Sequence, residues 1–293
     1  MRAFILLGLA LVGTVGLAQA PSAGGDWSGV ERALGRTGKA QAGGVYKFGL
    51  PRGDMKVTAD GVAIKPTLAL GSWLAFTGSG SNAMVMGDLV LSEEEVSPVM
   101  LALTQGGLEV TALHNHVLHE TPRVMYMHVS GHGDAVKLAT TLHDAIALTG
   151  TPGQTQGAAQ GPLEIDQAQV ESALGYKGAV NGGVLQVSVP RAEKVMEGGM
   201  EIPPSMGTAT ALNFQPTGGG KAAITGDFVL IGSEVNPVVR VLRLNGIQVT
   251  AIHSHMLDEE PRLFFMHFWA NDDAVKLAKG LRAAVDVTNS KKP

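Results

Sequence analysis

The stretch "ALHNHVLHETPRVMYMH" at residues 112–128 occurs again, in altered form, as "AIHSHMLDEEPRLFFMH" at residues 251–267. Around them, residues 110–139 and 249–278 align without a gap and are identical at 17 of 30 positions. The two copies are 139 residues apart, which is much longer than the roughly 20 to 50 residues of a solenoid repeat. The pattern therefore indicates duplication of a domain-sized unit.

Weaker matches extend the duplication upstream. "GDLVL" at 87–91 corresponds to "GDFVL" at 226–230, and "PR" at 51–52 corresponds to "PR" at 190–191. Between the copies, "TGTPGQTQGAAQGP" is polar and rich in Gly, Gln and Pro, which is typical of a linker. The predicted organisation is a first repeat unit over 21–149, a linker over 150–162 and a second repeat unit over 163–293.

The first twenty residues, "MRAFILLGLALVGTVGLAQA", have the pattern of a secretory signal peptide. One basic residue precedes an apolar run, and small residues at Ala18 and Ala20 suit cleavage near Ala20. No later stretch approaches the roughly 18 apolar residues that a membrane-spanning helix needs. We therefore expect a periplasmic or secreted protein without a membrane span.

Composition narrows the classes of partner and cofactor. The chain has no cysteine, so it forms no disulfide, and its net charge of −4 comes without a basic block, which argues against nucleic acid. No phosphate-binding glycine loop, dinucleotide fingerprint or nucleophile with a paired base is recognisable, so no nucleotide cofactor is expected. A small molecule or an envelope component remains as the partner.

Local patterns predict the elements of each unit. In the first unit, 85–91 reads as a strand, Ser97 and Pro98 suit the start of a helix to about Thr104, and 108–118 and 124–129 alternate as strands. Asp134 then caps a second helix. The predicted fold class is α+β, with two tandem homologous units, each an antiparallel sheet covered on one face by two helices.

Side chains alternate across a strand, so His114 and His116 point to the same face. If 124–129 pairs antiparallel with 111–118 through the loop 119–123, His114 lies opposite His128 and His116 lies opposite Tyr126. Three imidazoles then share one sheet face. The other face, which includes Leu113, is apolar enough to take the helices.

The second repeat preserves this division. His253, His255 and His267 face one way, whereas Ile252 faces the other. The chain has nine histidines, and six of them occupy these matched positions. The pattern therefore predicts one histidine triad in each repeat.

Three neutral imidazoles suit Zn²⁺ or another divalent transition metal, with nitrogen ligands at about 2.0 to 2.1 Å for zinc. Glu120 and Glu259 are candidates for a fourth ligand, with water as the alternative. His119 and His132 give the first repeat spare ligands that the second repeat lacks. The competing interpretation is that the histidines are hydrogen-bonded on a partly covered sheet face and bind no metal.

The carboxylates and arginines near the histidines have either a structural role or a functional role. Arg123 and Arg262 follow a proline in the predicted hairpin loop, where each pairs with a carboxylate or forms an anion or substrate clamp. Asp88 and Asp227 follow a glycine within a strand, which is more typical of turn or pairing residues than of catalytic ones.

The duplicated "HNHxxxExPRxxxMH" units after a signal peptide resemble the LppY/LpqO family of exported bacterial proteins, a family of unknown function. The resemblance implies an exported two-repeat protein and no particular reaction. The leading hypothesis is an exported protein that binds a transition metal through strand-borne histidines; whether it is an enzyme stays open. The alternative is a non-enzymatic envelope protein that binds a ligand or has a structural role without metal.

Overall fold

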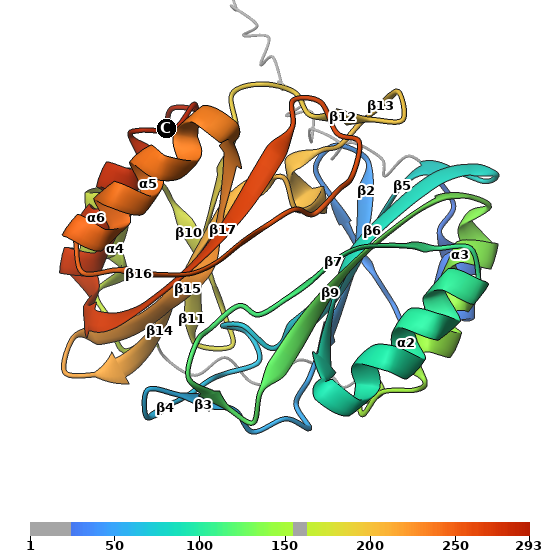
Figure 1. Cartoon of the computed structure of the whole chain (residues 1–293), viewed down its shortest axis with the longest axis horizontal. Helices are drawn as coiled ribbons and strands as arrows, with labels where there is room; N and C mark the ends of the chain where they lie inside the picture. The colour runs from blue at the N-terminus through green and yellow to red at the C-terminus, as the bar shows by residue number, and fades with distance from the viewer. Residues whose placement is uncertain (1–24, 155–162) are drawn as a thin grey trace, which may run out of the picture.

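A computed structural model describes residues 25–154 and 163–293. The predicted signal peptide and most of the predicted linker lie outside the described residues. Two units of the same fold lie side by side, each built on a six-stranded antiparallel sheet. Figure 1 shows the two sheets toward the middle of the molecule and the helices on its two outer sides.

The first unit has the sheet order β1-β2-β5-β6-β9-β7. These strands are β1 (Lys39–Gln41), β2 (Val45–Pro51), β5 (Gly71–Ser79), β6 (Asn82–Ser92), β9 (Val124–Gly133) and β7 (Glu109–His114). The helices are α1 (Ser28–Leu34), α2 (Glu93–Gln105) and α3 (Ala135–Ile146). A small separate sheet holds β3 (Thr58–Ala59), β4 (Val62–Ala63) and β8 (Glu120–Thr121).

The second unit has the equivalent order β10-β11-β14-β15-β17-β16. These strands are β10 (Gly178–Asn181), β11 (Val184–Pro190), β14 (Ala209–Gly218), β15 (Lys221–Ile231), β17 (Leu263–Asp273) and β16 (Gln248–His253). The helices are α4 (Gln167–Leu174), α5 (Gly232–Leu244) and α6 (Ala274–Val285), with a short η1 (Pro204–Met206) and the hairpin β12 (Met196–Glu197) and β13 (Met200–Glu201). The duplicated sequence is therefore a duplicated fold.

The predicted fold class is confirmed, because helices cover the outer face of each sheet. On α3, Leu138 and Leu142 recur at helical spacing and are buried against the sheet in the same apolar cluster as Met127. The predicted cap at its start is also correct, since the Asp134 carboxylate accepts a hydrogen bond from Lys137 N at 2.9 Å. Burying a leucine side chain contributes about 1.5–3 kcal/mol, so this face holds the helix to the sheet.

Helix α2 begins earlier than the sequence pattern predicted. It starts at Glu93, and Pro98 lies inside it. The reason is a second capping signal upstream, because the Glu95 carboxylate accepts a hydrogen bond from Ser92 N at 2.9 Å. Helix formation at Ser92 leaves Pro98 in the second turn instead of at the first helical position.

The "PR" sequence repeated in both units supplies a buried arginine to this helix start. Arg52 is 2% exposed and lies 2.7 Å from the Glu95 carboxylate, and Arg191 makes the same 2.7 Å contact with Glu234. Each arginine also donates to a strand carbonyl. Removing one partner of a buried ion pair costs about 3–5 kcal/mol, so this match between the repeats is structural.

The pairing of β7 with β9 differs from the predicted register. His128 pairs with Ala112, and His114 pairs with Tyr126, whereas the prediction placed His114 opposite His128. A β-bulge between Val110 and Ala112 also shifts the register by one residue within the pair. The strand ends at His114, so His116 lies in the following loop and not in the strand. A shift of two residues keeps side chains on their faces, so the histidines still gather.

The predicted helix-facing role of Leu113 and Ile252 is wrong. Their exposed fractions are 40% and 50%. Each is the next-to-last residue of an edge strand, β7 or β16, where the helix layer leaves it uncovered.

The inner faces of the two sheets pack against each other through two apolar clusters. One cluster joins Val124 and Tyr126 to Trp269, and the other joins Met86 to Phe265. Short hairpins reach across as well, with β3 and β4 beneath the second unit and β12 and β13 above the first in Figure 1. Among the described residues, no helix is both long and apolar enough to cross a bilayer.

Candidate metal centre

The six matched histidines meet between the two sheets, flanked by the two apolar clusters. His114 and His128 belong to the first unit and His253 and His267 to the second, and the rings of His114 and His253 stack with centroids 3.6 Å apart. His116 and His255 lie in the loops that follow β7 and β16. Four of the six are nearly buried, with exposed fractions of 9% for His114, 3% for His128, 5% for His255 and 3% for His267.

Matched hydrogen bonds hold the two histidine-bearing segments together. The Thr111 hydroxyl donates to the His255 carbonyl at 2.7 Å, and the Thr250 hydroxyl donates to the His116 carbonyl at 2.5 Å. Thr111 and Thr250 are equivalent residues of the two repeats. The repeats therefore meet as two copies related by an approximate two-fold axis, each using the same surface.

Histidines of different repeats come closest. His114 Nε2 lies 3.2 Å from His267 Nε2. Two groups of three have ligand atoms all within 4.8 Å of one another: His114 with His253 and His267, and His128 with His253 and His255. Both groups mix the repeats, whereas the sequence suggested one triad within each repeat.

Backbone carbonyls orient two of the rings. His267 Nδ1 donates to the Gly226 carbonyl at 2.7 Å, and His128 is hydrogen-bonded to the backbone of Gly87. With Nδ1 as donor, His267 presents the Nε2 lone pair to the centre, as second-sphere hydrogen bonds do at metal sites. A side chain at Gly226 would put its Cβ 1.9 Å from the Ala211 carbonyl oxygen, so this close packing requires glycine.

Asp88 and Asp227 lie beside the histidines, which the sequence reading missed. Asp88 on β6 pairs with His128 on β9, and Asp227 on β15 pairs with His267 on β17. Asp227 Oδ2 lies 2.9 Å from His255 Nε2, although not at a hydrogen-bonding angle, and Asp88 Oδ2 lies 3.6 Å from His116 Nε2. The "GD" repeated in both units could have drawn attention to these aspartates. However, local sequence does not indicate which strand pairs with the strand that carries them.

Burial keeps the imidazoles neutral. Loss of hydration lowers the pKa of all six cluster histidines, and for His114 the neighbouring His267 and His128 lower it further. The pKa of His255 falls to about 3. Neutral imidazoles offer the lone pairs that a metal ion requires.

The same burial acts oppositely on the carboxyl groups. It raises the pKa of Asp227 to about 6, and it raises the pKa of Asp88 well above its usual range, with repulsion from Asp227 adding to the effect. Lys47 is the cation that acts on Asp88, and its own pKa falls to about 8 because it is buried. The ammonium group lies 4.2 Å above the Trp73 ring and donates to the Ser205 carbonyl.

Many polar atoms of the centre have no hydrogen-bond partner within residues 25–154 and 163–293. They include both ring nitrogens of His253 and one oxygen each of Asp88 and Asp227. In all, seven buried imidazole nitrogens are in this state, from His114, His116, His128, His253 and His255. Each unsatisfied buried group costs about 1–3 kcal/mol, so together they would offset most of a typical 5–15 kcal/mol stability. These atoms fit a cation bound among them.

The outer side of each loop histidine is covered by an aromatic ring. His116 stacks on Tyr126 with centroids 3.3 Å apart, and His255 stacks on Phe265 at 3.5 Å. Tyr126 and Phe265 are equivalent in the two repeats, but only the tyrosine carries a hydroxyl. The rings limit the directions in which the imidazoles can turn.

The structure places Glu120 in the short strand β8 and Glu259 in the connection between β16 and β17, and neither belongs to a group of close ligand atoms. The Glu120 carboxylate accepts from Val124 N at 3.1 Å, and Glu259 accepts from Leu263 N at 2.7 Å. Burial raises the pKa of Glu120 to about 7.

The arginines of the loops differ between the repeats. Arg262 lies 3.2 Å from Glu259 and donates to the Leu257 carbonyl and the Ser254 hydroxyl. All three partners belong to the same loop, so these contacts stabilise the loop conformation. Arg123 is exposed. The spare histidines suggested for the first repeat, His119 and His132, are also exposed and join neither group.

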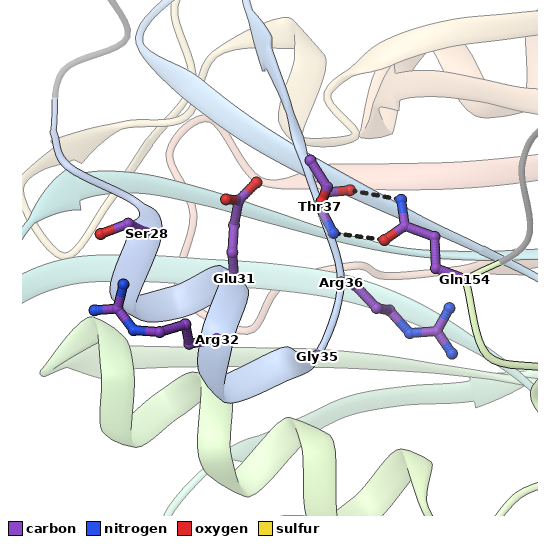
Figure 2. A pocket seen from close by; sticks show the side chains of 7 residues that line it. All are labelled: Ser28, Glu31, Arg32, Gly35, Arg36, Thr37 and Gln154. Carbon is purple, nitrogen blue, oxygen red and sulfur yellow. Dashed lines mark hydrogen bonds between the residues drawn. The ribbon is translucent and has the colours of Figure 1, made fainter.

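Two hollows in the described surface are lined by residues other than the six histidines. Figure 2 shows one, lined by Glu31, Arg36, Thr37 and other residues, where Gln154 accepts a hydrogen bond from Thr37 N at 2.6 Å. A second is lined by residues between 190 and 208 and between 289 and 292.

Fold and site together define a duplicated α+β protein with a buried histidine centre, able to hold a metal ion, between its repeats. Residues 28–148 and 168–287 each match the family model described as Domain of Unknown Function (DUF1259). The chain belongs to this family and contains its domain twice.

Other comparisons add little. No curated protein matches the chain. One solved structure, titled "Crystal structure of a trimeric bacterial microcompartment shell protein PduB", is similar over 86% of this chain and 90% of that chain, at 11% identity and a TM-score of 0.22. A likeness at that TM-score supports no inference about function.

Proposed function

We propose that this protein binds a transition-metal ion at the histidine centre between its repeats. The observation that carries the proposal is the convergence of buried imidazole nitrogens without hydrogen-bond partners in the described chain. A folded protein pairs nearly all of its buried polar atoms, and a cluster of exceptions calls for a partner from outside the chain.

Ligand chemistry selects the class of ion. Neutral imidazole suits Zn²⁺, Cu²⁺, Ni²⁺ and Fe²⁺, whereas Mg²⁺ and Ca²⁺ prefer oxygen. The 3.2 Å between the Nε2 atoms of His114 and His267 is close to the separation of two nitrogens on one tetrahedral Zn²⁺ at about 2.0–2.1 Å. Backbone hydrogen bonds to His128 and His267 would hold those ligands in orientation.

The proposal includes export and the finer family assignment. The signal-like first twenty residues support a periplasmic or secreted location, and the duplicated histidine motifs support membership in the LppY/LpqO family. A metal site assembled outside the cytoplasm needs no cysteine thiolate, in agreement with a chain without cysteine.

The alternative is an envelope protein in which the histidines only fill the space between two packed sheets. Apolar clusters on both sides of the histidines support it, because they would hold the repeats together without metal. In that case ordered water would satisfy the imidazoles. The two hypotheses predict different amounts of bound metal and different changes in stability when metal is added.

Metal analysis tests the proposal. The mature chain is stripped with chelator, reloaded with Zn²⁺ or Cu²⁺, desalted and assayed for bound metal. We expect bound metal in the wild type and a large loss in the double variant His128→Ala, His253→Ala. His132→Ala is the matched control, because His132 lies four residues after His128 on β9 but is exposed.

Stability supplies a second measurement. Zn²⁺ at 100 times its dissociation constant stabilises the folded state by about 2.7 kcal/mol, so the wild type and the control should melt higher with metal. The double variant should gain much less in melting temperature from the metal than the wild type does. The proposal would be refuted if the wild type bound neither Zn²⁺ nor Cu²⁺ and its melting temperature were the same with and without each metal. That result would favour the structural alternative.

A further inference from the structure

We propose that the centre holds two metal ions, one ligated by His253, His255, His128 and Asp227, and the other by the equivalent His114, His116, His267 and Asp88. This inference rests on the proposed function and specifies its stoichiometry and its carboxylate ligands. Each ion would take two histidines and one aspartate from one repeat and its third histidine from the other repeat.

Geometry argues against one shared ion. Nitrogens bound to a single ion at about 2.0–2.1 Å lie at most about 4.2 Å apart. Five of the six histidines form two overlapping groups of close ligand atoms, and His114 and His128 do not occur in the same group. Their ring centroids are 5.1 Å apart. One ion therefore cannot take all the imidazoles that face the centre.

The approximate two-fold axis argues for a pair. A site lying off the axis has an equivalent on the other side, because the repeats meet through the same surface. The group of His128, His253 and His255 is one such off-axis site. Exchanging each residue for its repeat equivalent gives His267, His114 and His116.

Distances support this second set. His114 Nε2 and His267 Nε2 are 3.2 Å apart, and the ring centroids of His116 and His267 are 3.8 Å apart. The centroids of His128 and His255 are also 3.8 Å apart, so the two sets match. Only in the first set do all three histidines have ligand atoms within 4.8 Å of one another, so this set should fill first.

Each set has a carboxylate beside its loop histidine. Asp227 Oδ2 is 2.9 Å from His255 Nε2, and Asp88 Oδ2 is 3.6 Å from His116 Nε2. One oxygen of each aspartate is buried without a partner in the part of the chain that the structure describes. Two buried carboxylates that repel each other, each next to unpaired imidazoles, would be balanced by one cation apiece.

Zinc titration of the chelator-treated full-length mature chain tests the inference. We expect two Zn²⁺ per chain, bound in two steps, with the first step tighter. Asp227→Asn should weaken the first step at least tenfold, and Asp88→Asn should do the same to the second. Asp144→Asn, at an exposed position on α3, is the matched control and should change neither step.

The outcomes separate the two proposals. One Zn²⁺ per chain at saturation would overturn the two-ion inference and leave the proposed function intact, whereas no bound Zn²⁺ would overturn both. Two ions with unchanged affinity in both aspartate variants would overturn the carboxylate assignment. The wild-type stoichiometry needs no variant, so the inference stays testable even if an aspartate variant fails to fold.

Discussion

His114 Nε2 and His267 Nε2 lie 3.2 Å apart although the two residues are 153 positions apart in the chain. Without a metal, one nitrogen must carry a hydrogen and donate it to the other. With a metal, both nitrogens present lone pairs to the ion. The contact joins the two repeats, so an ion bound there would fasten one unit to the other.

His114→Ala and His267→Ala should therefore have non-additive effects on metal-dependent stability. Either change alone should remove most of the stabilisation that the Zn²⁺ ion bound by these two residues provides, and the double variant should lose little more, because both nitrogens serve one ion. The measurement is urea unfolding with saturating Zn²⁺ and with chelator. The pair His132→Ala and His267→Ala is the control. A double variant of His114 and His267 that loses the sum of the single effects would show that the two residues act separately.

Thr111→Val and Thr250→Val should each destabilise the protein by about 1–2 kcal/mol, because each removes a buried hydrogen bond between the repeats and strands a carbonyl. Urea unfolding measures the change. Thr140→Val, at an exposed position on α3, should stay within about 0.5 kcal/mol of wild type. If all three variants changed the free energy of unfolding equally, the hydrogen bonds between the repeats would not stabilise the protein more than an exposed threonine does.

The metal-free protein should lose stability steeply as the pH falls below about 6.5. Burial lowers the pKa of the six cluster histidines, so the unfolded chain binds protons in this range that the folded chain does not. Stability is then present above the unfolded pKa of 6.5 and is lost as the pH falls toward the folded values.

The carboxyl groups of the centre partly oppose this trend. The pKa of Asp227 rises to about 6 and that of Asp88 also rises, so the folded chain holds protons on them that the unfolded chain releases. Because the histidines outnumber these two carboxyl groups, stability should still fall as the pH falls. Urea unfolding between pH 5.5 and 7.5 measures the slope of stability against pH. If the slope corresponds to the uptake of one proton or fewer on unfolding, it would contradict the burial of the six cluster histidines.

Much of the fold follows from local patterns. The duplication, the strand alternation around His114 and the cap at Asp134 were all predictable, because they depend on residues close together in sequence. The start of α2 was misjudged for a local reason, since Ser92 and Glu95 offered a second cap ahead of Pro98. The register of β7 was misjudged because the prediction continued the strand to residue 118, whereas β7 ends at His114 and a longer connection leads to β9.

The sequence by itself identified the six matched histidines and the two copies of one α+β unit that carry them. The tertiary structure decided how they are grouped. Sequence comparison pairs His114 with His253 because they are equivalent, but it carries no information on which repeat supplies a neighbour. Only the packing of the two sheets about an approximate two-fold axis brings His267 to His114 and places Asp88 and Asp227 beside the imidazoles, since those contacts join strands that are distant in the chain.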